Sequence, residues 1–356
     1  MKHFCSTGRA GACVAVSTRL SNSSVWAERY GDTPKMGGTE IIQNSGINIK
    51  ALSAPSSLRW LSLVFVDWLF IVGALGTAYY FQNLFAYWAA SLVIGNRLHA
   101  LSIMGHDAAH RTASKRKSLN DTLACLFAFW PIGVGLNGYR DFHFTHHRNV
   151  GTSSDPELKH KQWSTPQYEL PLRQGVLLKY VLKDLIGFAV KEVWSLILVV
   201  KPRSTLDIAG PLLMISSFWL VCLLTGNAWI LALWYFSIVT SFWACFRMRV
   251  WIEHVGTRST HRVHTNSLAR IVFAPHGAGY HFEHHQWPSV PCWNLGKARL
   301  AETLTPILTL TQIMKFYENH SFLPSGALPE VEEEIVVSTD LTAVQVESVS
   351  ACAIPR

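Results

Sequence analysis

Histidine is concentrated in three short motifs of this chain and at one further position. His106 and His110 stand four residues apart in GHDAAH, a spacing that puts both imidazoles on one face of a helix. The motifs DFHFTHH, WIEHVG and YHFEHH add seven more: His143, His146, His147, His254, His281, His284 and His285. Neutral imidazole is the commonest side-chain ligand for metals, so the set predicts a metal site.

The number of imidazoles predicts two metal ions. A single i, i+4 pair would more often be ordinary than metal-binding, but nine imidazoles together exceed the coordination number of one ion. Without metal they would be costly to desolvate and would repel one another if protonated. Imidazole suits zinc, iron, copper and nickel, so ligand type leaves the metal open. A hydrolytic zinc site needs only about three or four protein ligands, so the surplus favours a dinuclear site for oxygen chemistry.

Long apolar runs around these motifs predict an all-α integral membrane protein. Hydrophobic residues make up 49% of the chain and charged residues 15%, whereas a soluble domain carries about 25% charged residues. Runs of about 20 apolar residues span a bilayer as helices. We expect four transmembrane helices in two hairpins, at residues 58–81, 84–104, 206–225 and 228–248. The connections at 82–83 and 226–227 carry no charge, which favours tight turns.

Lys and Arg residues gather in the loop between the two hairpins, at 111–203. The positive-inside rule therefore places this loop, both termini and the histidine motifs on the cytosolic side, where they form a helical cap. Within the loop, residues 119–136 are apolar but broken by Pro131 and Gly133, which predicts a re-entrant or interfacial segment. Residues 176–200 predict one amphipathic helix on the membrane surface, with its lysines in one stripe.

The ends of the chain are polar. Residues 1–55 predict a mostly disordered cytosolic tail, residues 56–322 a membrane domain with its cap, and residues 323–356 a polar, acidic tail. No apolar segment follows the N-terminus, which argues against a cleavable signal peptide. The seven cysteines are scattered and form no CxxC, which favours a reducing compartment. The net charge of +8 comes from residues that flank apolar runs, so we expect no nucleic-acid partner.

The motifs HDAAH, HFTHH and HFEHH resemble the three histidine boxes of the integral-membrane fatty acid desaturase family. APHGAGYHFEHHQWPSVPCWNL is similar to the third box of its acyl-lipid desaturase-like branch, and the resemblance covers residues 58–299. It implies two iron ions on the cytosolic side, with His254 matching a further histidine that many relatives place after the last span. The implied iron ligands are His106, His110, His143, His146, His147, His254, His281, His284 and His285.

Five further residues are candidates for supporting roles. His276 is a candidate tenth ligand, a water-mediated partner or a hydrogen-bond donor to a ligand. Asp107, Asp141 and Glu283 stand beside ligands and are expected to orient imidazoles through their N–H groups, with solvated carboxylates as the alternative. Asp155 follows the second box, where relatives often carry an acid; it either supports a ligand or forms a plain turn.

The remaining histidines are expected to play lesser roles. We expect His160, His261 and His264 to be solvated loop residues. His99 lies seven residues before His106 and is expected to support a ligand or face the lumen rather than bind metal.

The resemblance implies an O2-dependent desaturase that introduces a double bond into a long acyl chain or a similar hydrophobic substrate. The HPGG signature of a fused cytochrome b5 domain is absent, so we expect a separate electron donor of the cytochrome b5 or ferredoxin type. The same boxes would serve a hydroxylase or ketolase of a carotenoid or terpenoid. A zinc-dependent membrane hydrolase or receptor is the alternative from a different class. The membrane would be the endoplasmic reticulum in a eukaryote or the inner membrane in a bacterium.

Overall fold

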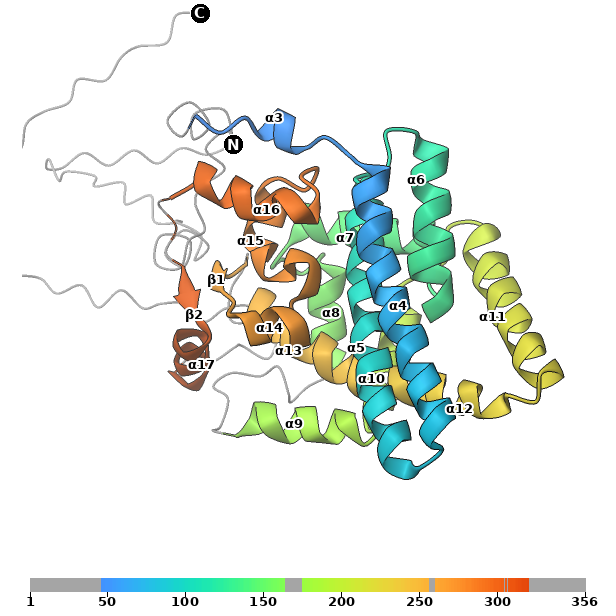
Figure 1. The fold of residues 1–356 in the computed structure, drawn as a ribbon. Coiled ribbons are helices and arrows are strands. Elements are labelled where there is room, and N and C mark those ends of the chain that lie inside the picture. The colour runs from blue at the N-terminus through green and yellow to red at the C-terminus, as the bar shows by residue number, and fades with distance from the viewer. Residues whose placement is uncertain (1–45, 164–174, 256–259, 304, 306, 320–356) are drawn as a thin grey trace, which may run out of the picture.

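The computed structural model describes residues 46–163, 175–255, 260–303, 305 and 307–319 (Figure 1). These residues are mostly helical, as predicted, with one two-stranded parallel sheet formed by β1 (Val263–His264) and β2 (Leu308–Thr309). Most of the predicted N-terminal tail and all of the predicted C-terminal tail lie outside the described residues.

The first predicted hairpin is present as α4 (Ser57–Phe81) and α5 (Leu84–Ala109). The turn between them is tight because Gln82 takes a left-handed conformation, with φ of 44°. The next residue caps α5, since Asn83 Oδ1 accepts a hydrogen bond from the Ala86 N–H at 2.9 Å.

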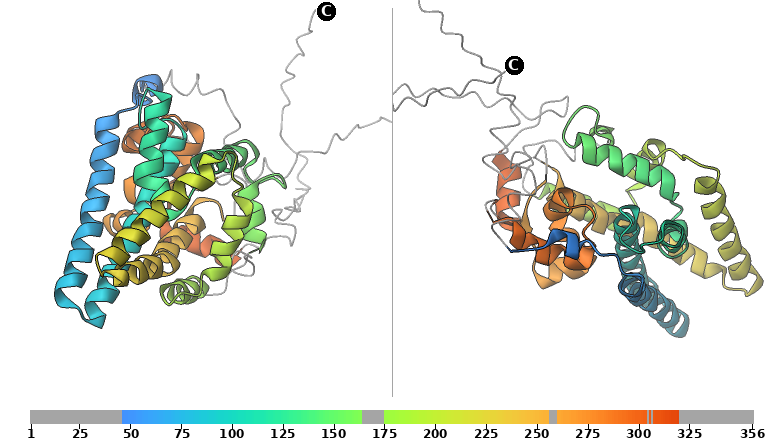
Figure 2. Two further views of the ribbon diagram at one scale, coloured as in Figure 1. Left: turned by 90° about the vertical axis from the view of Figure 1, so that its right-hand side faces the viewer. Right: turned by 90° about the horizontal axis from the view of Figure 1, so that it is seen from above.

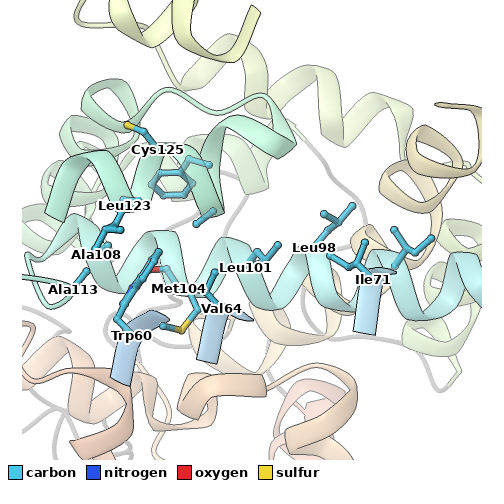
Figure 3. Close-up of a cluster of buried hydrophobic side chains, with 14 of the residues drawn as sticks. Trp60, Val64, Ile71, Leu98, Leu101, Met104, Ala108, Ala113, Leu123 and Cys125 are labelled. Carbon is cyan, nitrogen blue, oxygen red and sulfur yellow. The ribbon is translucent and has the colours of Figure 1, made fainter. Parts of the chain in front are cut away.

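Large apolar side chains hold the two helices of this hairpin together. Trp60, Val64 and Ile71 of α4 are fully buried or nearly so, and they pack against α5 (Figure 3). The contacting side chains of α5 include Leu98 and Met104, and the Trp60 indole N–H donates to the Met104 carbonyl oxygen at 3.2 Å. The metal motif at the end of α5 is therefore carried by a well-packed helix.

The apolar segment after α5 is broken, as its Pro and Gly residues predicted. It consists of α6 (Lys117–Ala124), a π-helical turn (Cys125–Phe129) and a short 3-10 turn (Trp130–Ile132). Gly133 is left-handed, with φ of 80°, and the chain then enters α7 (Leu136–Asn149) at 92° to the preceding helix. This bend directs the second histidine motif across the end of α5.

The prediction of one amphipathic helix at 176–200 is wrong. The segment forms two helices, α9 (Val176–Leu185) and α10 (Val190–Val199), because Gly187 adopts φ of 88° between them. α8 (Pro156–Trp163) precedes them and packs against α10. A buried acid also turns α9 inward, since Asp184 Oδ1 accepts from Arg247 Nη2 of α13 at 2.8 Å. The outer faces still expose large apolar side chains, including Leu178 and Trp194.

The second hairpin consists of α11 (Leu206–Leu224) and a longer helix that runs from Ala228 to Glu253. The longer helix contains α12 (Ala228–Ser237), a π-helical turn (Ile238–Phe242) and α13 (Trp243–Glu253). It extends five residues beyond the predicted span and ends immediately before His254.

Short elements complete the cap. They are α3 (Ile49–Leu52), α14 (Ser267–Val272), the 3-10 turn η4 (Pro275–Tyr280), α15 (His281–Gln286), α16 (Cys292–Ala298), η5 (Arg299–Ala301) and α17 (Leu310–Asn319). Ile49 of α3 is buried against Trp287 and Leu295, so residues 46–55 differ from the predicted disordered tail. These residues pack against the cap because burial of the apolar Ile49 side chain is favourable.

Three described helices are long and apolar enough to cross a membrane: α4, α11 and the continuous α12–α13 helix. The bent pair α6–α7 would add a fourth if it counts as one span. α5 was predicted as the second span, but it is not among the three because Asn96, Arg97 and His99 interrupt its apolar sequence. The tips of both hairpins extend away from α15 and α16 (Figures 1 and 2).

Candidate metal centre

The histidine motifs meet where four helices end. His106 and His110 lie at the last turn of α5, and α7 carries the second motif across this end. His254 caps the C-terminus of α13, and α15 carries the third motif. Pro288 and Pro291 follow α15, and proline cannot continue a helix, so the motif occupies a helix of only six residues.

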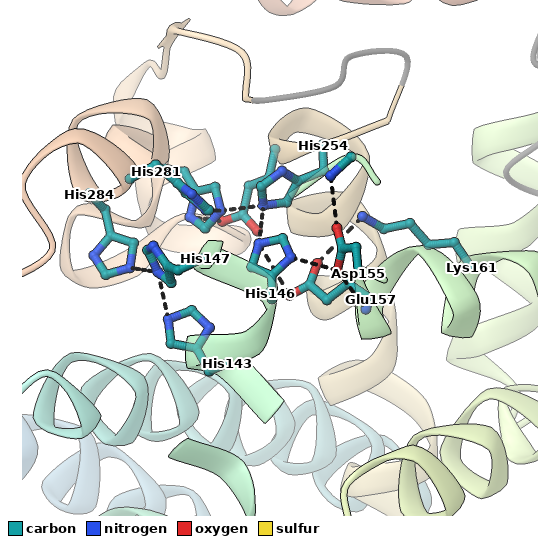
Figure 4. A network of polar contacts seen from close by, with 12 residues as sticks. His143, His146, His147, Asp155, Glu157, Lys161, His254, His281 and His284 are labelled. Atoms are coloured by element: carbon teal, nitrogen blue, oxygen red, sulfur yellow. Dashed lines mark hydrogen bonds and ion pairs between the residues drawn. The ribbon is translucent and has the colours of Figure 1, made fainter. Parts of the chain in front are cut away.

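Nine imidazoles form two groups, and within each group the ligand atoms lie within 4.8 Å of one another. The first group combines His106 and His110, at the end of α5, with two histidines from α7 and one from α15. The second combines the four others, and Figure 4 labels members of both groups. The first group is His106, His110, His143, His147 and His284. The second group is His146, His254, His281 and His285. The nine histidines singled out from the sequence are thus the nine that converge.

The geometry fits metal binding because the Nε2 atoms point at common centres. His143 Nε2 lies 2.8 Å from His110 Nε2 and 2.9 Å from His147 Nε2. Nitrogens bound at right angles to one ion, each about 2.1 Å away, lie about 3 Å apart. His106 Nε2 is buried and has no hydrogen-bond partner among the described residues, so its lone pair is available. Each group therefore fits one imidazole-bound ion.

Burial favours the neutral form of most of these imidazoles, whereas at His146 the nearby Glu157 and Asp155 outweigh burial and raise the pKa. Burial lowers the pKa of His281, His284 and His285 well below the usual value of 6.5, and neighbouring histidines lower it further. Only an unprotonated Nε2 can donate its lone pair to a metal. The burial that makes the cluster unfavourable for protons therefore prepares it for cations.

Two carboxylates contact the Nδ1 side of histidine rings in the second group. Asp155 Oδ1 accepts from His146 Nδ1 at 2.9 Å, which leaves His146 Nε2 as the metal-facing nitrogen. Asp155 is fixed in turn by the N–H groups of Gly151 and Glu157, at 3.1 and 2.9 Å. On the second ring, Glu253 Oε1 lies 3.3 Å from His281 Nδ1.

Sequence reasoning missed three charged residues at this site. Glu253 also accepts from buried Arg249 Nε at 2.6 Å. Glu157 Oε1 lies 4.0 Å from His146 Nε2, at the edge of the second group (Figure 4). Burial would raise the pKa of Glu157, but His146 and Lys161 outweigh it and hold that pKa well below the usual range. Glu253 lies in the WIEHVG segment, Arg249 lies two residues before that segment, and Glu157 lies two residues after Asp155. Proximity to the motifs was therefore the available signal.

The other predicted supporting acids have different partners. Asp107 accepts from the Thr112 hydroxyl at 2.6 Å and from the Cys292 N–H at 3.0 Å, which ties α5 to α16. Asp141 pairs with Arg203 at 2.8 Å on the surface. Glu283 is fully buried and binds two arginines of the cap. Among the described residues, none of these three carboxylates orients an imidazole. Each accepts from a hydroxyl, a backbone N–H or an arginine instead.

His276 also differs from its prediction. Its Nε2 lies 2.7 Å from Asp67 Oδ2, and it belongs to neither imidazole group. The prediction that His160 and His261 are solvated is wrong. Both are buried, with contacts to the Ser195 hydroxyl at 2.9 Å and the Val255 carbonyl at 2.8 Å.

The two remaining histidines lie apart from both groups. His264 is exposed, as predicted. His99 is buried beside Phe242 and Phe246, and neither of its ring nitrogens has a hydrogen-bond partner among the described residues.

Asp155→Asn should weaken metal binding about 10- to 100-fold, because the His146 ring loses the carboxylate that fixes its tautomer and raises its basicity. Metal retained after dialysis against a graded series of chelator concentrations measures this. Asp141→Asn is the matched control, since it removes an exposed carboxylate from the same motif. Equal metal retention by the two variants would contradict the role of Asp155.

Known proteins with similar sequences support the same interpretation of the histidine motifs. Residues 82–311 match the sequence model of the fatty acid desaturase family. The chain is 27% identical over 235 residues to dihydrorhizobitoxine desaturase of Bradyrhizobium elkanii, covering 59% of this chain and 66% of that one. It is 36% identical over 103 residues to an sn-1 acyl-lipid omega-3 desaturase (ferredoxin) of Synechocystis, covering 29% of this chain and 28% of that one.

A third relative is the sn-1 acyl-lipid omega-3 desaturase (ferredoxin) of Nostoc, 32% identical over 127 residues, with 36% of this chain and 35% of that one covered. The chain thus spans just under two thirds of the first relative and about a third of the others.

Proposed function

The chain belongs to the fatty acid desaturase family, and on that basis we propose that it is a membrane-bound, O2-dependent di-iron desaturase. Its substrate is a long acyl chain or a similar hydrophobic molecule, into which it introduces a double bond. The observation that carries this proposal is the convergence of nine imidazoles in two groups. A hydrolytic zinc site needs about three protein ligands, so the second group would have no role in a zinc hydrolase or receptor.

We assign one iron to each imidazole group. When bound, the two irons would supply the oxygen chemistry that removes hydrogen from two neighbouring carbons of the substrate. The residues of the chain hold the site: buried imidazoles present unprotonated Nε2 atoms, and Asp155 holds the Nδ1 proton of His146. Glu253 and Arg249 form a buried ion pair beside His281, which compensates charge where water is excluded.

The arrangement supports four transmembrane spans with the metal centre on the cytosolic side. α5 has 26 residues and returns alongside α4, which has 25, so a membrane crossed by α4 is crossed by α5 as well. The loop that follows α5 exposes Arg111, Lys115 and Lys117, as the positive-inside rule requires of a cytosolic loop. The membrane domain and cap occupy residues 56–322, and residues 46–55 pack onto them.

Electrons come from a separate protein of the ferredoxin or cytochrome b5 type. Two of the relatives carry ferredoxin in their names, which supports the first type. The substrate range extends beyond ordinary fatty acids, because another relative is named for dihydrorhizobitoxine. The membrane is the inner membrane in a bacterium or the endoplasmic reticulum in a eukaryote.

Expression of the chain with a ferredoxin or cytochrome b5 reductase system should yield O2-dependent products that lack two hydrogens. Mass spectrometry of lipids and small hydrophobic metabolites detects them, and His146→Ala should eliminate them. Products that gain oxygen would identify a hydroxylase or ketolase instead. Purified protein that contains zinc and forms neither product would overturn the proposal.

A further inference from the structure

A cavity lies beside the candidate metal centre, between α4, η4 and α16. Its volume is about 300 Å³. Leu63, Ala274 and Trp293 give it apolar walls, whereas Thr265, Arg270 and His276 place polar groups on its lining. A cavity that combines apolar walls with a guanidinium fits an amphiphile better than a purely apolar or purely polar ligand.

This cavity adjoins the metal centre through a shared wall. His276, Gly277 and Cys292 line it, and they also line a much smaller cavity of about 20 Å³. The smaller cavity touches the ligands His106 and His284, and it has room for about one water-sized molecule. The two cavities therefore share one wall, and histidines of the candidate metal centre line the smaller one.

Arg270 is the cation of the larger cavity. Its Nε donates to the Thr265 carbonyl oxygen at 3.1 Å, which fixes the stem of the side chain. Among the described residues, no carboxylate lies within ion-pair distance of Arg270, and its terminal nitrogens donate to no other group. A guanidinium whose two terminal nitrogens donate to none of the described residues matches a carboxylate or a phosphate.

The cavity lies near the N-terminal end of the candidate membrane span α4. Leu63 stands six residues after the first residue of α4, a distance of about 9 Å along the helix axis. α14, which carries Arg270, exposes Leu268 and Ile271 on its outer face, 68% and 64% respectively. An exposed apolar face with an arginine at its edge is typical of a helix at the boundary between head groups and hydrocarbon.

The wall shared by the two cavities is held in place by a contact with α4. His276 and Gly277 are both left-handed, with φ of 49° and 77°. The His276 ring is held in place by Asp67, a buried acid of α4 that also binds Arg97 Nη1 at 3.2 Å. The α14–η4 segment is thus anchored to α4 and α5, and His276 lines both cavities.

We propose that the larger cavity binds the oxyanion head of an amphiphilic substrate at Arg270, so that its chain is directed past His276 toward the metal centre. This inference rests on the proposed function for the chemistry of the metal centre, but it concerns binding alone. The head is a carboxylate or a phosphate, supplied by a free acid or by a membrane lipid.

The test measures binding to the full-length protein in neutral detergent without added iron. The probes are radiolabelled stearate for the carboxylate, a short-chain phosphatidic acid for the phosphate, and methyl stearate as the uncharged comparison. Arg270→Gln should weaken stearate or phosphatidic acid binding about tenfold, because one charge-assisted contact is lost, and leave methyl stearate binding unchanged. Arg270→Lys should retain part of the affinity.

Lys297→Gln is the matched control, because it removes one exposed positive charge from α16 without touching the cavity. A loss confined to stearate assigns the site to free acids, and a loss confined to phosphatidic acid assigns it to lipids; either result supports the inference. Equal binding by wild type and Arg270→Gln, or an equal loss in Lys297→Gln, would overturn it. Failure of the proposed function would appear separately, as absence of dehydrogenated products from wild-type protein that still binds the probes.

Discussion

Replacing His254 with alanine should abolish product formation and lower the iron content from two ions to about one per chain. His254 belongs to the smaller group of imidazoles, where its Nε2 lies 2.7 Å from His281 Nε2 and 3.1 Å from His146 Nε2. Its removal leaves three imidazoles for that ion and opens the centre of the group. Loss of residues that merely support a ligand costs about 10- to 100-fold, so loss of a ligand should exceed 100-fold. Metal analysis and product formation are measured on the same purified samples.

His264→Ala is the control for this experiment. His264 is ten residues further along the chain, exposed and outside both groups, so its replacement should leave metal content and products unchanged. Two irons retained in His254→Ala, with normal products, would show that the smaller group does not bind an ion. The first group alone would then have to account for the activity.

The helical architecture was predictable because its determinants are local. Length and hydropathy predicted the paired helices, and the uncharged QN turn predicted the first hairpin, which Gln82 and Asn83 form as expected. The break near Pro131 followed from proline and glycine chemistry. The split between α9 and α10 was missed because the lysine stripe outweighed Gly187 and Asp184 in the interpretation, although both residues favour a break or an inward contact.

The convergence of the histidines was predictable because imidazoles in such numbers have few uses other than metal binding. The hydrogen-bond partners of the nearby acids were not predictable, because a carboxylate can pair with donors that are remote in sequence. Asp155 contacts His146 from nine residues away, whereas Glu283, which lies between two ligands, turns to Arg262 and Arg299 instead. The His276 ring contacts Asp67, which lies 209 residues earlier in the chain. Proximity in sequence therefore identified the histidines that converge but not the partners of the charged residues beside them.

The buried acid of the third motif holds the cap together, and its replacement should have the largest effect on stability. Glu283 Oε1 accepts from Arg262 Nε at 2.8 Å and from Arg299 Nε at 2.7 Å, and all three side chains are buried or nearly so. Glu283→Gln removes the charge but keeps the shape. It should lower the free energy of unfolding by about 3 kcal/mol, because breaking a buried ion pair leaves uncompensated charge in the interior.

Asp141→Asn provides the comparison, since it removes one carboxylate from an ion pair that is exposed rather than buried. The side chains of Arg203 and Asp141 are 58% and 45% exposed, so their separation should cost less than about 1 kcal/mol. Unfolding of both variants in mixed micelles, followed by circular dichroism, gives the two free energies under the same conditions. If Glu283→Gln cost no more than Asp141→Asn, the arginine pair would not depend on Glu283. The position of α15, and with it the third set of ligands, would then have to be maintained by apolar packing alone.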